Sequence, residues 1–337
     1  MNSNKVFIIA EIGVNHNGKL KFAKKLVYIA KNAGADAVKF QSFKADKLAF
    51  KNTPKVKYQK INSPKSQSHY EMLKKLELSN NDHKQLIDYC KKLKIEFIST
   101  PYDVESAKFL LSSGIKKFKT ASADIIDYYL QDFLSKNAKE VIISTGMASY
   151  KEIKEALSMY RKKKTKISLL HCISNYPCSD ESLNLNNIKS LNKKFNLPIG
   201  FSDHSQNNNS SLIAIGLGAR IIERHITLNK KLKGPDHFSS DDPNEFKKYV
   251  KQIRNAEKIL GSYEKKVQKE EFEMKKISRK GVYYLSDIPS GKRVKLNNLQ
   301  LLRPSTNLTV FEIKNLLKKK LKKNVSKNTA LNKNDFK

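Results

Sequence analysis

Short apolar runs rich in β-branched and aromatic residues recur along the chain as far as Thr227. Their length, and their alternation with longer segments of helical periodicity, is typical of buried parallel strands joined by helices. The predicted strands are Phe7–Gly13, Ala37–Phe43, Glu96–Tyr102, Lys117–Asp124, Glu140–Met147, Ile167–Tyr176, Leu197–Ser205 and Ala219–Thr227.

The segments between these strands place apolar residues three and four positions apart, which predicts helices with one buried face. In Leu20–Ala33 that face carries Ala23, Leu26, Val27 and Ala30. The other predicted helices are His83–Leu93, Val104–Leu111, Tyr150–Tyr160, Asn207–Leu217 and Asn244–Leu260.

This order of elements predicts an α/β fold, a (β/α)8 TIM barrel over residues 1–262. A doubly wound open sheet is the alternative, but no GxGxxG motif follows the first strand to support it. The segment Lys44–Asn81 is long and rich in Lys, Ser and Asn. We expect it to be a loop at the active-site end of the barrel.

The pattern changes after the barrel. Gly261–Ser278 mixes Glu with Lys, which predicts a linker (263–278) or a bridging helix. Residues 279–337 predict a second, small α+β domain. Its expected strands are Gly281–Leu285 and Leu299–Leu302, and its expected helix is Val310–Leu321.

The formal net charge of the 337 residues is +34, a value found among nucleic-acid-binding proteins. The cations are almost all Lys and are spread over the whole chain, whereas nucleic-acid surfaces favour Arg with interleaved aromatic residues. We therefore expect a solvated basic surface and no nucleic-acid partner. A Lys-rich nucleic-acid-binding protein with an inactive barrel is the alternative from another class.

No run approaches the roughly twenty apolar residues that span a bilayer, and the N-terminus has no signal-peptide pattern. We expect a cytoplasmic protein without a membrane partner. The cysteines Cys90, Cys172 and Cys178 are odd in number and lack framework spacing, so no disulfide scaffold is expected.

Each predicted strand begins apolar and turns polar toward its carboxyl end. The carboxyl ends of barrel strands meet at one rim, where barrel enzymes carry their chemistry, so these side chains predict a site. They are Glu11, Lys39, Gln41, Thr100, Lys119, Ser122, Asp124, Ser144, Ser174, Tyr176, Ser202, His204, Glu223 and His225.

Side chains alternate across a strand, so His204 and His225 are expected to point inward from neighbouring strands about 4.8 Å apart. Two imidazoles at that separation can share one divalent metal, although two core histidines bonded to backbone carbonyls are the alternative. Lys39 and Lys119 lie in apolar strands, where an ammonium group needs a partner. They are either structural ion pairs or, as we favour, cations that hold a phosphate or carboxylate.

The motifs at these strand ends resemble those of the sialic acid synthase family, in particular members that make N-acetylneuraminate or N,N′-diacetyllegionaminate. The matching segments are collinear over nearly the whole chain, and the tail resembles the family's small antifreeze-like (SAF) domain. They are Ala10–Gly18, Val38–Gln41, Phe97–Pro101, Ile143–Met147, Gly200–Ser205, Ile222–His225, Gly234–His237 and, in the tail, Arg303–Pro304.

The resemblance implies that His204 and His225 bind a divalent metal, usually Mn²⁺, with Mg²⁺ as the alternative. It implies a role for Glu223 in orienting water, and Glu11 or Asp124 is our candidate for proton transfer. Phosphoenolpyruvate would be held by Lys39, Lys119, Ser122, Ser144 and Ser202, with Ser174 at a position where some members have Asn. The sugar would be lined by Glu11, Gln41, Thr100, Tyr176 and Asp236, and its N-acyl group would contact Arg303.

The implied reaction condenses phosphoenolpyruvate with an N-acetylmannosamine-type aldehyde and water, releasing phosphate, in a domain-swapped homodimer. A pseudaminate-type synthase is the alternative within the enzyme class. Two departures from the family pattern affect the sugar contacts and domain docking more than the chemistry. Ala123-Asp124 stands where the family usually has Gly-Glu, and no glycine follows Arg303-Pro304.

Overall fold

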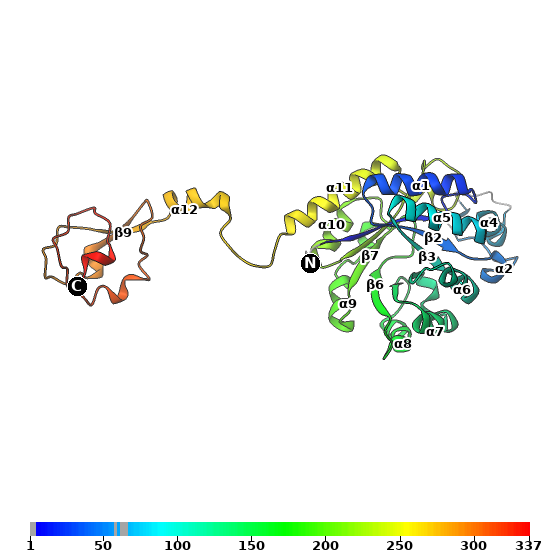
Figure 1. Cartoon of the computed structure of the whole chain (residues 1–337), viewed down its shortest axis with the longest axis horizontal. Helices are drawn as coiled ribbons and strands as arrows, with labels where there is room; N and C mark the ends of the chain where they lie inside the picture. Colours follow the sequence, from blue (N-terminus) through cyan, green and yellow to red (C-terminus); the bar gives the residue numbers. More distant parts are fainter. Residues whose placement is uncertain (1–4, 57–58, 61–66) are drawn as a thin grey trace. The chain divides into compact units, whose positions relative to one another are not determined.

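The computed structural model describes residues 5–56, 59–60 and 67–337 (Figure 1). The chain divides into two compact units, Met1–Gly261 and Ser262–Lys337. None of the helices in the described ranges is long and apolar enough to cross a membrane.

In the first unit, parallel strands close into a barrel in chain order, which confirms the predicted TIM barrel. The closure pairs β1 with β8, so that Glu11 lies opposite Lys39 on one side and opposite His225 on the other. The strands are β1 Phe7–Gly13, β2 Ala37–Ser42, β3 Glu96–Pro101, β4 Lys117–Thr120, β5 Glu140–Ser144, β6 Lys166–His171, β7 Ile199–Asp203 and β8 Ile221–His225.

Helices surround these strands and bury one apolar face each against the outside of the barrel (Figure 1). Two of them, α7 and α9, were not predicted, because α7 also exposes Tyr128 and Tyr129 and α9 buries only Ile188 and Leu191. The helices are α1 Leu20–Ala33, α5 Asn80–Leu93, α6 Val104–Ser112, α7 Tyr128–Asn137, α8 Tyr150–Tyr160, α9 Asn187–Phe195, α10 Asn209–Gly216 and α11 Pro243–Leu260.

A layer of apolar side chains fills the barrel below its carboxyl end. These residues form one buried cluster, separate from the helix-facing core, and most stand two positions before a predicted site residue. Because side chains alternate along a strand, the same inward face is apolar in the barrel centre and polar at the rim. The layer consists of Ile9, Ala37, Ile98, Ile142, Leu170 and Ile221.

Several predicted strands end earlier than expected. The clearest case is the fourth, which ends at Thr120, while Ser122–Ile126 forms a 3-10 helix. The hydrogen bonds of this segment are local, since the Asp124 N–H donates to the Ala121 carbonyl. Ser122 and Asp124 therefore reach the rim from a turn.

Lys44–Asn81 is not a structureless loop. It contains α2 (Ala45–Leu48) and α4 (His69–Leu76), while residues 57–58 and 61–66 of this segment lie outside the described part. The α4 residues Met72, Leu73 and Leu76 are buried in a small apolar cluster of their own. A core beside the rim therefore holds this segment in place.

The second unit pairs β9 (Gly281–Tyr284) with β10 (Leu299–Leu302) in antiparallel fashion. It also contains α12 (Phe272–Ser278), inside the predicted linker. The predicted helix over Val310–Leu321 is wrong, because only Ile313–Asn315 forms a single 3-10 turn there. Ile313 and Leu321 are both fully buried in the small core of this unit, and the Leu321 amide bonds to the Lys292 carbonyl instead of continuing a helix.

Candidate active site

A cavity of about 710 Å³ lies at the carboxyl ends of the barrel strands. It is lined by every barrel residue that the sequence placed in the site, including those that reach it from turns. Arg303 lies exposed in the second unit. The lining residues that had been predicted are Glu11, Lys39, Gln41, Thr100, Lys119, Ser122, Asp124, Ser144, Ser174, Tyr176, Ser202, His204, Glu223, His225 and Asp236.

Lys39 and Lys119 are both almost fully buried in this cavity, and the carboxylate of Glu223 lies near both of them. The Lys39 ammonium lies 2.9 Å from Glu11 Oε2 and 3.8 Å from Glu223 Oε2. The Lys119 ammonium lies 3.9 Å from Glu223 Oε1 and donates to the Ser144 hydroxyl. Two buried cations therefore face two carboxylates inside the cavity.

The two carboxylates differ in their electrostatic surroundings. Burial is the main cause that raises the pKa of Glu11 to about 7, against the attraction of Lys39. Burial also acts to raise the pKa of Glu223, but Lys119 and Lys39 together lower it to about 2. At neutral pH Glu223 is thus a fixed anion, while Glu11 can take up or release a proton.

Of the two lysines, Lys119 is the one whose charged form is stabilised less by the neighbouring carboxylates. Burial lowers its pKa despite the attraction of Glu223, whereas Glu11 and Glu223 outweigh burial and raise the pKa of Lys39. An anion placed beside Lys119 would restore the balance, because an opposite charge favours the charged form of a buried amine.

A group of small polar side chains surrounds Gly146, beyond the end of β5. The Gly146 amide donates to Ser122 Oγ at 3.0 Å, and Ser122 Oγ lies 3.2 Å from the Cys172 sulfur. A Cβ atom at Gly146 would lie only 2.5 Å from Ser174 Oγ and 2.8 Å from Ser122 Oγ. Only glycine therefore allows the hydroxyls of Ser122 and Ser174 to gather against this backbone, as anion-binding turns require.

His204 and His225 face one another with ring centroids 5.8 Å apart. The His204 Nδ1 lies 2.7 Å from the Ile173 carbonyl, so this nitrogen is the donor, and Nε2, which lies 3.2 Å from Ser202 Oγ, carries the lone pair. Burial is the first cause that lowers the pKa of both imidazoles, that of His225 well below its usual value. Both rings are therefore neutral, the form that ligates metals.

These residues fit a divalent metal. The Nδ1 atom of His225 is buried without a hydrogen-bond partner, an arrangement that costs free energy unless something binds there. Within residues 5–56, 59–60 and 67–337, no group of three or more His, Cys, Asp or Glu residues is arranged to hold a metal ion. A metal on the two imidazoles would thus take its other ligands from water or substrate, as open catalytic sites do.

Two further carboxyl groups at the cavity have pKa values close to neutral pH. Burial raises the pKa of Asp124 to about 7, with help from the nearby Asp127. Burial raises the pKa of Asp236 to about 6, against the attraction of Lys39. Either group can exchange a proton with a bound molecule at physiological pH.

Sequence reasoning missed two parts of the lining. Cys172 was not among the predicted site residues, yet it lies beside Ser122 in the cavity wall, and its even spacing from Ser174 was the available signal. Leu48, Met72 and Leu76, from the segment expected to be a loop, form an apolar wall. The four-residue spacing of Met72 and Leu76 was hidden by the Lys-rich composition around them.

Comparison with known proteins agrees with this geometry. The NeuB family model matches residues 26–265. The chain is 45% identical over 331 residues to a protein named N,N′-diacetyllegionaminic acid synthase from Legionella pneumophila, covering 96% of this chain and 93% of the relative. It is 42% identical over 323 residues to the protein of the same name from Campylobacter jejuni, covering 95% and 97%.

A solved structure is also similar. The crystal structure of N-acetylneuraminic acid (sialic acid) synthetase from Leptospira borgpetersenii, in complex with citrate, has a TM-score of 0.72 and 35% sequence identity. The match covers 81% of this chain and 90% of that one. The chain therefore belongs to the NeuB family.

Proposed function

We propose that the chain condenses phosphoenolpyruvate with an N-acetylated amino-sugar aldehyde and water to give a nonulosonic acid and phosphate. The observation that carries this proposal is the pair of buried lysines, Lys39 and Lys119, in the same cavity as two neutral imidazoles. A small, highly charged anion suits the lysines, and an aldehyde oxygen suits an electrophile held by the imidazoles.

In this proposal Lys119, Ser122 and Ser144 bind the phosphate, and Lys39 offsets the carboxylate of phosphoenolpyruvate. The Gly146 amide orients the Ser122 hydroxyl by donating to it, and the Ser174 hydroxyl lies against the same turn. Binding in fixed orientation brings the alkene carbon, C3, within reach of the aldehyde carbon.

A divalent metal, Mn²⁺ or Mg²⁺, would be held by His204 and His225 and would supply Lewis-acid polarisation of the aldehyde oxygen. As C3 of phosphoenolpyruvate forms the new carbon–carbon bond, the aldehyde oxygen gains a proton and becomes a hydroxyl. Glu11 is our donor for this proton, since its pKa of about 7 leaves a protonated fraction at neutral pH. Asp124 is the second candidate, for the same reason.

Positive character develops at C2, and water adds there. Glu223 is permanently ionised and accepts a hydrogen bond from Ser202 at 2.9 Å, so its carboxylate is fixed and able to orient this water. As water adds, one of its protons returns to Glu11, and the other remains on the new hydroxyl of the tetrahedral intermediate. That hydroxyl proton passes to the bridging oxygen as the bond between C2 and this oxygen breaks, and phosphate leaves with its charge offset by Lys119 and Lys39.

For the product we propose N,N′-diacetyllegionaminate, because the two relatives at 45% and 42% identity carry that name. The test is incubation of the purified protein with phosphoenolpyruvate, Mn²⁺ and one of three aldehyde precursors, those of N-acetylneuraminate, diacetyllegionaminate and pseudaminate. Product masses are then read for each. A product only from the pseudaminate precursor would replace our assignment, and no product from any would overturn the function.

We also propose that Ser262–Lys337 is an antifreeze-like (SAF) domain and that Arg303 completes the site of the partner subunit in a domain-swapped homodimer. An arginine fork suits an acyl carbonyl because it offers several donors. Mixing His204→Ala with Arg303→Ala chains tests this. With free exchange, half of the dimers are heterodimers with one intact site each, so roughly a quarter of wild-type activity should return. Heterodimers without activity would refute the swap.

A further inference from the structure

The strands β7 and β8 carry site residues on one face and a second set of charged residues on the other. Ser202 and His204 point into the cavity, and Asp203 lies between them; Glu223 and His225 do so on β8, with Arg224 between them. The ladder pairs Asp203 directly with Arg224. Both are almost fully buried, so an ion pair sits immediately behind four residues of the site.

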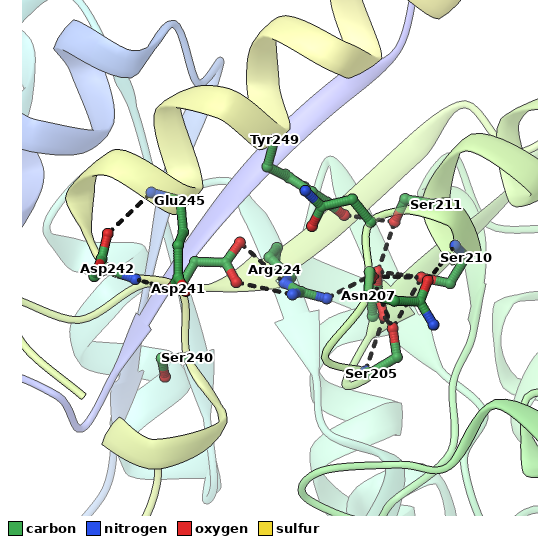
Figure 2. Close-up of polar contacts among 12 residues, drawn as sticks. Ser205, Asn207, Ser210, Ser211, Arg224, Ser240, Asp241, Asp242, Glu245 and Tyr249 are labelled. Atoms are coloured by element: carbon green, nitrogen blue, oxygen red, sulfur yellow. Dashed lines mark hydrogen bonds and ion pairs between the residues drawn. The ribbon is translucent and has the colours of Figure 1, made fainter. Parts of the chain in front are cut away.

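Arg224 contacts two separate segments of the chain, through Asp203 at the end of β7 and Asp241 before α11 (Figure 2). Its Nη1 lies 3.1 Å from Asp203 Oδ2. Its Nε and Nη2 lie 3.1 Å and 2.8 Å from the two carboxylate oxygens of Asp241, a bidentate contact. The guanidinium also lies 5.1 Å from the centre of the Tyr249 ring, on α11. Such a fork fixes direction as well as charge.

Asp203 has every acceptor position in use. Its Oδ1 accepts from the amide and the hydroxyl of Ser205, at 2.9 Å and 2.7 Å. Its Oδ2 accepts from the hydroxyls of Ser210 and Ser211, both at 2.8 Å, at the start of α10 (Figure 2). The carboxylate therefore ties the loop after β7 and the next helix to one point beside His204.

Asp241 links the same network to the backbone of the site. Its side chain holds Arg224, while its amide donates to the His225 carbonyl at 2.9 Å and its carbonyl accepts from the Thr227 amide at 2.9 Å. Through one residue, the position of the guanidinium is thus coupled to the position of the His225 main chain.

We propose that Arg224 is a positioning residue: with Asp203 and Asp241 it sets the separation and orientation of the two strand ends that carry the imidazoles and Glu223. The inference rests on the proposed metal-binding function of the cavity. To share one ion, each imidazole must be held within about half an ångström of its position in the ligand geometry. Rigid contacts behind the ligands supply that precision. A lysine cannot replace the arginine, since one ammonium cannot make both the bidentate contact and the strand-to-strand contact.

The test compares two Arg→Lys variants of the full chain, and Mn²⁺ alone is the probe. Arg224→Lys alters the network behind the site. Arg254→Lys is the matched control on α11, where Arg254 bridges Asp36 and Glu257 away from the cavity. Free Mn²⁺ is counted by electron paramagnetic resonance during titration, without substrate. We expect Arg224→Lys to weaken Mn²⁺ binding by about 10-fold or more, and Arg254→Lys to leave it within about 2-fold.

Equal Mn²⁺ affinity of Arg224→Lys and the wild type, or equal losses in both variants, would overturn the positioning role. Asp241→Asn keeps the shape of the side chain and removes its charge, so it supplies the same test if Arg224→Lys does not fold, with the same expected loss. If the wild type binds no Mn²⁺, the proposed metal site fails and the inference with it. That result is distinct from a wild type that binds and variants that bind equally well.

Discussion

The two ends of strand β4 carry lysines two residues apart, which point to the same inner face of the barrel at opposite ends. Lys117, at the amino end, lies 3.2 Å from Glu96 and 3.5 Å from Glu140, and its side chain is 22% exposed. Lys119, at the carboxyl end, is 3% exposed and lies no closer than 3.9 Å to Glu223.

The same residue type on one strand thus meets two different environments. At the amino end each charged side chain has a partner of opposite charge and access to solvent, so no ligand is needed to stabilise it. At the carboxyl end the charges are desolvated and incompletely balanced, and burial lowers the pKa of Lys119. Buried charges that a protein does not satisfy by itself are expected where a ligand will satisfy them.

The largest expected effect tests whether the carboxyl end depends on a metal. A chelator should abolish turnover by the wild type, and a divalent metal should restore it, because the two neutral imidazoles then lose and regain their ion. His225→Ala should weaken metal binding by more than about 100-fold, beyond the usual effect of changes around a ligand. Glu140→Gln, at the amino end, is the control and should keep its metal affinity. Full turnover in excess chelator would end the metal proposal.

The next effect separates the two lysines directly. Lys119→Met should lower kcat/KM for phosphoenolpyruvate by about 10²–10³-fold, because a preorganised cation is lost where phosphate charge develops. Lys117→Met removes the same group from the other end of the strand and should change kcat/KM by less than about 5-fold, since no reacting group lies there. Steady-state kinetics check both. Similar losses of kcat/KM in the two variants would show that the lysines at the two ends of the strand do not differ in their role.

A smaller effect concerns protonation at the carboxyl end. The pKa of Asp124 is about 7 in the folded chain against 3.8 for the free group. The stability that comes from keeping it protonated is fully present below pH 3.8 and is lost as the pH rises through 7. Asp124→Asn resembles the neutral form at every pH. The difference in free energy of unfolding between this variant and the wild type should therefore rise by about 2 kcal/mol, in favour of the variant, from pH 5 to pH 8.

Urea denaturation of both proteins at the two pH values gives this difference. A constant offset between them at pH 5 and pH 8 would show that Asp124 is ionised in the folded chain throughout, and would remove it as a proton donor in the reaction.

The smallest effect belongs to the amino end. Glu96→Gln breaks one contact of Lys117, whose second partner, Glu140, remains. The Glu96 side chain is 38% exposed, so solvent screens the pair, and the free energy of unfolding should fall by less than about 1 kcal/mol. Thermal unfolding measures it. A loss of several kcal/mol would mean that charges at the amino end are as finely balanced as those in the cavity.

Much of the fold and the site could be predicted because both depend on local pattern. Apolar runs of strand length alternate with helical periodicity, and that order alone selects a barrel. Alternation along each strand also placed Ser202 and His204 on one face of their strand, and Glu223 and His225 on one face of theirs. Both faces line the cavity. Lys39 and Lys119 stood out for the same reason, since a charge in an apolar strand calls for an explanation.

Other features lay beyond local pattern. Val310–Leu321 has helical spacing of apolar residues, but in a small unit those side chains reach the core from turns, and burial outweighs helix propensity. The α2 and α4 helices were hidden because Lys-rich surroundings masked a short buried face.

What the sequence determined by itself is which residues face inward, because the alternation of a strand and the period of a helix are properties of the chain alone. Only the tertiary structure decided how those residues act on one another. Glu11 and Glu223 are both glutamates at strand ends, yet their pKa values lie at about 7 and about 2. Asp241 holds Arg224 from 17 residues away. Desolvation and charge interactions depend on distances in space, and those exist only once the barrel has closed.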